Sequence, residues 1–468
     1  MMLDFVQSAR PSVAPPLDSD FRPIVLANHA FLDAVRASGA EAPLAIALER
    51  ADGSVSTYET AASTRPEFAA ASVAYAERLV KMLLWQKGGW RVIVGGPREI
   101  GEHIRAVYSP GGARAFDAKF MAEVYERPFL VQVTEASTVP RTKEQAAPLG
   151  RHLDGCRIGF DLGASDRKVA AVIDGVPVFS EEVVWDPRDQ PDPKYHHDEI
   201  MSALRAAASH LPRVDAIGGS SAGVYINNRV MAASLFRGVP REVFVSQVRD
   251  MFLRMREEWG GIPFEVVNDG EVTALAGAMA LGENAVLGIA LGSSEAGGYV
   301  TPDGRITGWL NELAFAPVDV NVNAPVDEWS RDRGCGVQYL SQQAVARLAP
   351  AAGIVLDGSL TPPEKLKEVQ RLLAAGDPRA ASVFETIGVY LGYAVAHYAG
   401  FYDVRHVLIL GRVTSGEGGG ILVEKARGVL AAELPDLAER IVLHLPEDES
   451  SRRVGQAVAA ASLPAIGS

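Results

Sequence analysis

The chain has little cysteine, no excess of positive charge and no long apolar run. Its two cysteines, Cys156 and Cys335, lie far apart in the 468 residues, which argues against a disulfide framework and a thiolate zinc site. With 58 acidic and 45 basic residues the net charge is −13, so the basic footprint of a nucleic-acid-binding protein is missing. No run approaches membrane-spanning length, and the first residues lack the basic and apolar regions of a signal peptide. We expect a cytoplasmic protein that binds neither nucleic acid nor membrane.

The length predicts more than one domain. A hydrophobic content of 48% and a charged content of 22% are ordinary for a globular protein, and 468 residues suffice for two or three cores. Region 26–130 has the pattern of an α+β module, with no basic recognition helix. From Cys156 onward strands alternate with helices, which indicates α/β architecture. We therefore predict an N-terminal module at 1–150 and two further lobes at 151–285 and 286–468, with no short-period repeat.

The most informative motif runs from Ile158 to Gly175 and predicts a strand, a tight polar turn and a second strand. Gly163 allows the backbone to turn sharply, and Ser165 and Lys168 can donate to an anion. Asp161 is placed to hold a metal ion or its water. The pattern is typical of a phosphate-binding hairpin rather than of a loop in front of a helix.

Four later segments add glycine-bearing turns and a strand that ends in two polar residues. A strand ends in the small residues Ser220 and Ser221, and another ends in Asn268-Asp269 before a helix of small residues. A second strand-turn-strand contains Gly292 and Ser293. The last segment leads from a buried strand into a glycine loop. These segments are 216–224, 264–277, 286–300 and 407–420.

In this order the motifs resemble the ROK family of sugar kinases and related repressors, over about residues 156–466. The hallmarks of that family are an Asp-x-Gly-Gly-Thr hairpin, Asn-Asp at a strand end, a second glycine hairpin, a Gly-Glu-x-Gly-His segment and a late glycine loop. The segment that begins Gly334-Cys335 is similar to the Gly-Cys-Leu-Glu segment of the family. The order and spacing are specific, although each piece alone is not.

The resemblance implies a fold, cofactors and roles for individual residues. The expected fold class is α/β: a two-lobed, actin-like and ribonuclease-H-like sugar kinase fold with an extra N-terminal α+β module. The expected ligands are ATP, Mg²⁺ and a small sugar or polyol, and a homodimer is expected by resemblance alone. Asp269 would be the general base and Asp161 would serve Mg²⁺. The residues implied for the substrate are Asn268, Glu312, Ser220 and Ser221, and those implied for phosphate and nucleotide are Gly163, Ser165, Lys168, Gly292, Ser293, Gly411, Gly416 and Gly418.

Several positions depart from the family pattern. The first turn reads Gly163-Ala-Ser-Asp166, so that a carboxylate lies near the expected phosphate, with Arg167 and Lys168 available to offset it. In the second hairpin, Glu295 would repel a triphosphate if it faced the nucleotide. In the segment that binds sugar in the family, Phe315 occupies the position of the expected histidine. Further departures are Ser294, Ala296, Arg412 and the segment Ala233-Ser-Leu235.

The zinc motif is also incomplete, because the family's zinc cysteines align with Glu328, Ser330 and Cys335. We therefore expect no zinc and a ligand other than plain glucose. Simpler interpretations remain open: Asp269 as a helix cap, Glu312 as a surface carboxylate, Asp161 as a turn residue, 418–420 as a flexible turn, and His196-His197 as solvated loop residues. For function, a sugar kinase, a non-catalytic sugar or sugar-phosphate sensor and an actin-like ATPase are the three hypotheses.

Overall fold

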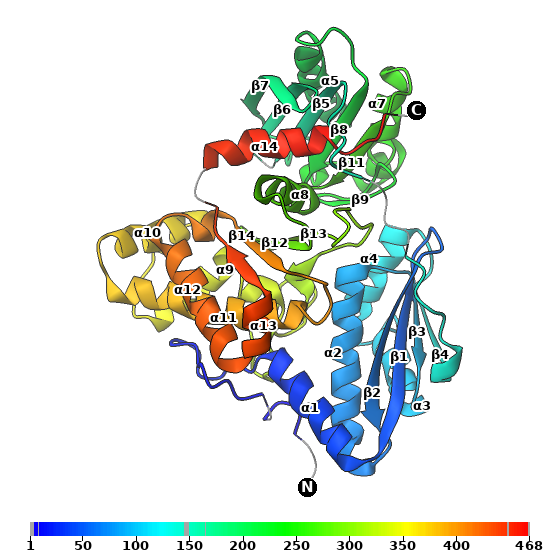
Figure 1. Cartoon of the computed structure of the whole chain (residues 1–468), viewed down its shortest axis with the longest axis vertical. Helices are drawn as coiled ribbons and strands as arrows, with labels where there is room; N and C mark the ends of the chain where they lie inside the picture. Colours follow the sequence, from blue (N-terminus) through cyan, green and yellow to red (C-terminus); the bar gives the residue numbers. More distant parts are fainter. Residues whose placement is uncertain (1–3, 8, 145–148, 164, 447–448, 467–468) are drawn as a thin grey trace. The chain divides into compact units, whose positions relative to one another are not determined.

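The computed structural model describes residues 4–7, 9–144, 149–163, 165–446 and 449–466 (Figure 1). The chain forms two compact units. The first contains Met1–Gln145, Ile289–Gly297 and Trp309–Leu445, and the second contains Ala146–Gly288, Gly298–Gly308 and Pro446–Ser468. The division into a module at 1–150 and lobes at 151–285 and 286–468 stays a prediction. Among the described residues, no helix combines the length and apolar character needed to cross a bilayer.

The N-terminal part of the first unit is a four-stranded sheet of order β2-β1-β3-β4 with helices packed on it. The tip of the β1–β2 hairpin follows from its sequence, since Gly53 has φ +81° and the Asp52 carboxylate accepts from the Ser54 backbone N–H. Helix α2 is buried along almost its whole length beside β1 and β2 (Figure 1). The elements are α1 Ile24–Ser38, β1 Glu41–Glu49, β2 Val55–Ser63, η1 Pro66–Phe68, α2 Ala69–Lys87, β3 Arg91–Gly95, α3 Arg98–Val107, α4 Ala115–Tyr125, β4 Leu130–Thr134 and η2 Ala136–Thr138.

The second unit is built on a five-stranded sheet of order β11-β8-β5-β6-β7, in which β5 pairs antiparallel with β6 and parallel with β8. Helix α14 lies across this sheet (Figure 1). Glycines permit the close approach, because a Cβ on Gly159 would lie 1.8 Å from the Ala457 carbonyl oxygen and a Cβ on Gly218 1.7 Å from that of Ala460. The elements are β5 Cys156–Leu162, β6 Asp166–Ile173, β7 Val176–Val184, α5 Pro193–Ala208, β8 Ala216–Ser221, β9 Val224–Ile226, β10 Arg229–Ala232, η3 Ser234–Phe236, α6 Arg241–Val243, η4 Phe244–Val248, α7 Met251–Glu258, β11 Phe264–Asn268, α8 Asp269–Leu281 and α14 Glu449–Ala461.

The rest of the chain supplies a sheet of order β13-β12-β14-β15 and a helical layer. Helices α11 and α12 pack closely because Gly388 and Gly392 on α11 leave room for the side of α12. The elements are β12 Val286–Leu291, β13 Glu295–Val300, η5 Leu313–Phe315, η6 Gly336–Gln338, α9 Gln342–Ala351, α10 Pro362–Ala374, α11 Pro378–Tyr398, β14 His406–Leu410, η7 Arg412–Thr414, α12 Glu417–Glu433, α13 Pro435–Arg440 and β15 Val442–His444.

The expected α/β class is confirmed by the sheets and helices of the described residues, but two loop predictions are wrong. His196 and His197 lie on helix α5, and His196 is fully buried with its Nε2 within 2.9 Å of the Pro187 carbonyl oxygen. Residues 418–420 form the first turn of α12 instead of a loop. Asp192 at the N-cap of α5 and Pro193 at its first position start that helix earlier than the Pro/Asp composition suggests.

Candidate functional site

Asp269 begins helix α8 immediately after strand β11. The residue is half-buried, and its Oδ1 accepts from the Gly270 backbone N–H at 3.0 Å. The N-cap of the helix is Asn268, whose Oδ1 accepts from the same N–H at 2.7 Å. The N-cap of α8 is therefore Asn268, whereas Asp269 is the first residue of the helix and is partly buried as a whole.

The pKa of Asp269 is raised to about 6 by burial and by the nearby negative charge of Asp161. A carboxylate with this pKa is mostly ionised at neutral pH and yet binds a proton far more readily than an ordinary aspartate. These are the properties that a general base needs close to its working pH.

Asp161 lies near the end of β5 and is only 5% exposed. The neighbouring strands set its partners, because Lys168 on β6 and Ser220 on β8 are its direct cross-strand neighbours. Ser220 Oγ donates to Oδ1 at 2.7 Å, and Lys168 Nζ lies 3.2 Å from Oδ2. Gln456 Nε2 on α14 approaches Oδ1 at 3.4 Å. Burial raises the pKa of Asp161 although Lys168 lowers it.

The surroundings of Asp161 fit a magnesium ion that arrives with phosphate, rather than a preformed metal site. Within the described ranges, no group of three His, Cys, Asp or Glu side chains could hold a metal ion. Mg²⁺ commonly uses one or two carboxylates together with phosphate oxygens and water, so a single carboxylate is compatible with it. The Lys168 ammonium beside Oδ2 would have to share that carboxylate.

The first hairpin turn contains Gly163, Ser165 and Asp166. The Gly163 N–H donates to the Asp166 carbonyl at 2.9 Å, and Ser165 is exposed with its Oγ 3.0 Å from Asp166 Oδ2. Lys168 Nζ lies 3.0 Å from Asp166 Oδ1, so this lysine offsets the unexpected carboxylate. Arg167 pairs instead with Glu199.

Two of the residues implied for sugar binding already have partners inside the second unit. Asn268 donates through Nδ2 to the Gly223 carbonyl at 2.7 Å, in addition to its capping bond. Ser221 is fully buried, and its hydroxyl lies 2.6 Å from the hydroxyl of Tyr225. Ser220, bonded to Asp161 and also fully buried, orients that carboxylate.

The turn of the second hairpin exposes Ser293 and Ser294, whereas Glu295 points into the protein. Glu295 is 2% exposed, and Tyr398 donates to its Oε1 at 2.9 Å. Its Oε2 packs against Gly336, where an added Cβ would lie 2.0 Å from that oxygen. Burial raises the pKa of Glu295 to about 8, so this carboxyl is mostly neutral at pH 7. A carboxyl that is buried and mostly neutral would not repel a triphosphate, contrary to the expectation for Glu295.

The remaining glycines of the second hairpin and of the late motif have packing roles. Gly292 accepts through its carbonyl from the Gln342 N–H that begins α9. Gly411 has φ +97°, and a Cβ there would lie 2.4 Å from the Leu291 carbonyl oxygen, so only glycine fits. Gly416 has φ +69° and open space around it, whereas Gly418 leaves room for the Phe384 ring. Arg412 is exposed.

Glu312 is half-buried at the start of η5, and its backbone N–H donates to the Trp85 carbonyl of α2 at 3.0 Å. Phe315, at the position of the family histidine, stacks on Trp85 with ring centroids 4.1 Å apart. An aromatic ring held this way is turned to packing rather than to hydrogen bonding with a ligand.

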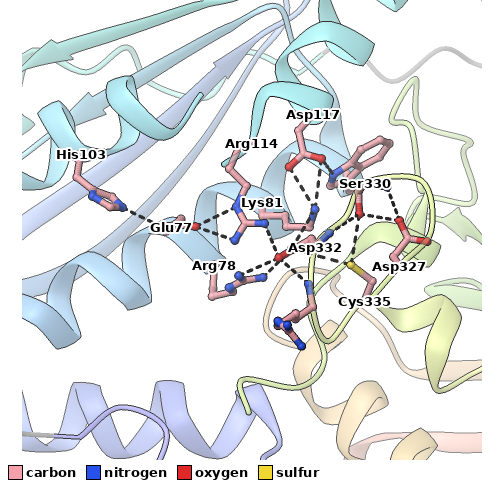
Figure 2. Close-up of polar contacts among 12 residues, drawn as sticks. Glu77, Arg78, Lys81, His103, Arg114, Asp117, Asp327, Ser330, Asp332 and Cys335 are labelled. Carbon is pink, nitrogen blue, oxygen red and sulfur yellow. Dashed lines mark hydrogen bonds and ion pairs between the residues drawn. The ribbon is translucent and has the colours of Figure 1, made fainter. Parts of the chain in front are cut away.

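Ion pairs fill the region around the residues that align with the zinc cysteines (Figure 2). Cys335 is fully buried with Sγ 3.9 Å from Ser330 Oγ, and burial raises its thiol pKa to about 12. Glu328 is exposed. Beside Cys335, the Asp332 carboxylate meets three cations, Arg78, Lys81 and Arg114. A protonated thiol next to a carboxylate already paired with cations does not favour zinc, and the expected absence of zinc stays a prediction.

The sequence did not point to Gln456, Tyr398 or Lys81. Gln456 reaches Asp161 across 295 positions of the chain, and Tyr398 reaches Glu295 across 103. Such pairings follow from the packing of α14 and α11, which helical periodicity alone cannot assign. For Lys81 a signal existed, since a lysine within a mostly apolar helical pattern calls for a buried partner.

No protein-family model matches the chain, and no curated protein matches its sequence. Solved structures share its fold. A ROK hexokinase from Thermus thermophilus aligns over 65% of this chain and 97% of its own, with 21% identity and a TM-score of 0.50. A ROK family transcriptional regulator, a homologue of E. coli MLC, aligns over 66% of this chain and 79% of its own, with 20% identity and a TM-score of 0.53. The chain therefore has the fold of ROK proteins, as the motif order predicted.

Proposed function

We propose that this protein is a ROK-like kinase that transfers the γ-phosphoryl group of ATP to a hydroxyl of a sugar or polyol, with Asp269 as general base. The observation that carries the proposal is Asp269, a half-buried residue at the junction of β11 and α8 whose carboxyl has a pKa of about 6. The shared fold with a ROK hexokinase supports the same assignment.

In the proposed reaction Asp269 accepts the proton of the substrate hydroxyl while the oxygen of that hydroxyl forms a bond to the γ-phosphorus. The bond from that phosphorus to the β–γ bridging oxygen breaks, and ADP leaves with the electron pair. Asp269 must be ionised before the step, so activity requires a pH above its pKa of about 6.

We assign phosphate contacts to residues of both hairpins. Mg²⁺ bound with the nucleotide would neutralise phosphate charge, and Asp161 would hold it directly or through water. The Lys168 ammonium, now shared by Asp161 and Asp166, would also contact phosphate. Backbone and hydroxyl donors would come from Gly163, Ser165, Gly292 and Ser293, and Gly411, Gly416 and Gly418 would lie near the adenosine.

The residues that we propose for the substrate are Asn268, Glu312, Ser220 and Ser221. Because Phe315 cannot replace the hydrogen bonds of a histidine, we propose a substrate other than plain glucose. A cytoplasmic location and a homodimer remain predictions from sequence.

The second candidate function is a non-catalytic sugar or sugar-phosphate sensor. The occupied amide of Asn268 and the stacked ring of Phe315 favour it, because both reduce the groups available to hold a hydroxyl for attack. The related regulator shows that proteins with this fold are not all kinases.

Two measurements separate these candidates. Thermal melting with Mg²⁺ and a non-hydrolysable ATP analogue, and with a panel of glucose, N-acetylmannosamine, sucrose and mannitol, reports binding of each ligand. ADP release is then measured with and without each sugar. A kinase is stabilised by nucleotide and by an acceptor and releases ADP only with the acceptor. Stabilisation by sugar alone indicates the sensor, and ADP release without sugar indicates an ATPase.

A further inference from the structure

The C-terminal end of helix α2 is hydrogen-bonded to the segment that contains Glu312. The Trp85 carbonyl accepts from the Glu312 N–H, and the Gln86 carbonyl accepts from the Asn311 N–H, both at 3.0 Å. Carbonyls in the last turn of a helix lack partners within the helix, so these bonds satisfy both sides. Asn311 has φ +51°, a left-handed backbone conformation that asparagine adopts more readily than most other non-glycine residues.

The side chain of Trp85 continues this attachment. Its ring stacks on Phe315 at 4.1 Å with an interplanar angle of 27°, and its Nε1 donates to Asp117 Oδ1 at 3.2 Å. Trp85 is fully buried, so water does not compete for either contact. Trp85 therefore holds both ends of the short segment 312–315: its backbone carbonyl accepts from the Glu312 N–H, and its ring stacks on Phe315.

A charged cluster fixes α2 against the loop 327–335 (Figure 2). Lys81 Nζ lies 3.2 Å from carboxylate oxygens of both Asp117 on α4 and Asp332 on the loop, and its side chain is fully buried. Arg78 and Arg114 contact the same Asp332 carboxylate at 2.7 and 2.5 Å. Although burial raises the pKa of Asp332, these three cations together hold it far below its ordinary value.

The loop in turn packs against the other side of the Glu312 segment. The Gly336 N–H donates to the Ala316 carbonyl at 2.9 Å, and Cys335 packs with Ala314 in a small apolar cluster. A Cβ on Gly336 would lie 2.7 Å from the Leu313 carbonyl oxygen, so the two backbones are in close contact. The segment is therefore held between α2 and a loop that α2 itself anchors.

We propose that Trp85 and Lys81 of the N-terminal region are positioning residues for Glu312, and that the acceptor hydroxyl is bound correctly only while α2 holds this segment. The part that concerns the acceptor rests on the proposed function, whereas the positioning of the segment does not. The N-terminal region is then a structural part of the acceptor site rather than a separate accessory module.

The test compares Trp85→Leu and Lys81→Met with Lys119→Met in the full chain. Lys119 is exposed on α4, so this variant repeats the chemical change without touching the cluster. Hydrogen–deuterium exchange of the peptide 309–316 should be about tenfold faster in the first two variants and unchanged in the third. Trp85→Phe keeps a stacked ring and should restore most of the protection. Equal protection in all variants would overturn the positioning.

Kinetics test the acceptor part, using whichever panel sugar supports ADP release. We expect Trp85→Leu to raise the KM for that sugar about tenfold, with the KM for ATP within about twofold of wild type. A proportional loss for both substrates would show a general structural defect and refute the acceptor part. If the wild type neither binds nor phosphorylates any panel sugar, the proposed function fails, and the exchange data alone decide whether α2 positions the segment. Should Trp85→Leu fail to fold, Phe315→Leu removes the same stack from the other side.

Discussion

The buried carboxyl of Glu295 yields the most quantitative prediction. Its pKa is raised from the ordinary value of 4.5 to about 8 by burial. The folded state therefore keeps a proton that the unfolded state releases, and stability that is present below pH 4.5 is lost as the pH rises through 8. Each pH unit in that interval lowers the free energy of unfolding by about 1.4 kcal/mol, which amounts to about 3 kcal/mol at pH 7.

The substitution Glu295→Gln removes this penalty, because glutamine is neutral and still accepts a hydrogen bond from Tyr398. Denaturant melts between pH 5 and 8 should show a stability that falls with pH more steeply in the wild type than in the variant, by about 1.4 kcal/mol per pH unit. The slope is the diagnostic quantity, since the new amide next to Gly336 adds a constant cost of about 1–3 kcal/mol if it lacks an acceptor. Glu424→Gln, exposed on α12, is the matched control and should follow the wild type.

Parallel pH dependence in the wild type and in Glu295→Gln would refute this reasoning. Glu295 would then be ionised in the folded protein, and the second hairpin would again carry a negative charge that opposes nucleotide binding. That result would strengthen the sensor hypothesis at the expense of the kinase.

Three further changes test separate parts of the account. Lys168→Met removes the ammonium between the two carboxylates of the first hairpin and should weaken the binding of ATP about tenfold, as followed by thermal melting with nucleotide; unchanged affinity would remove this lysine from the phosphate site. Gly411→Ala places a Cβ against the Leu291 carbonyl at a positive φ and should cost about 2–4 kcal/mol in denaturant melts, whereas Gly420→Ala, with open space around it, should not destabilise the fold. Asp332→Asn leaves buried cations without their carboxylate and should cost about 3–5 kcal/mol at pH 7, so a loss below about 1 kcal/mol would contradict the role given to the cluster.

Much of the fold could be predicted because local chemistry and pattern agree. The alternation around Phe160 and the turn at Gly163 predicted the antiparallel strands β5 and β6. Gly411 and Gly418 were expected to serve the nucleotide, yet in the structure they also leave room for the Leu291 backbone and the Phe384 ring. Sequence alone does not separate these two reasons for glycine, because both demand the absence of a side chain.

The sequence predicted which residues belong to the candidate site, but it did not predict how these residues are buried or which partners they contact. The carboxylate of Glu295 was expected to repel phosphate, but its strand turns it inward toward Tyr398. The attachment of α2 to Glu312 was not foreseen, because contacts between Trp85 and residues more than 200 positions later depend on tertiary packing. The role of the N-terminal region could therefore be addressed only with the structure.

The central claim is that Asp269 removes the proton from an acceptor hydroxyl. The most direct test measures ADP release with the active panel sugar against pH for the wild type and for Asp269→Asn. We expect the wild-type kcat/KM to fall below about pH 6, and the variant to lose at least about 100-fold in kcat while sugar still stabilises it in thermal melts. A variant that keeps the wild-type rate would contradict the assignment of Asp269 as the base.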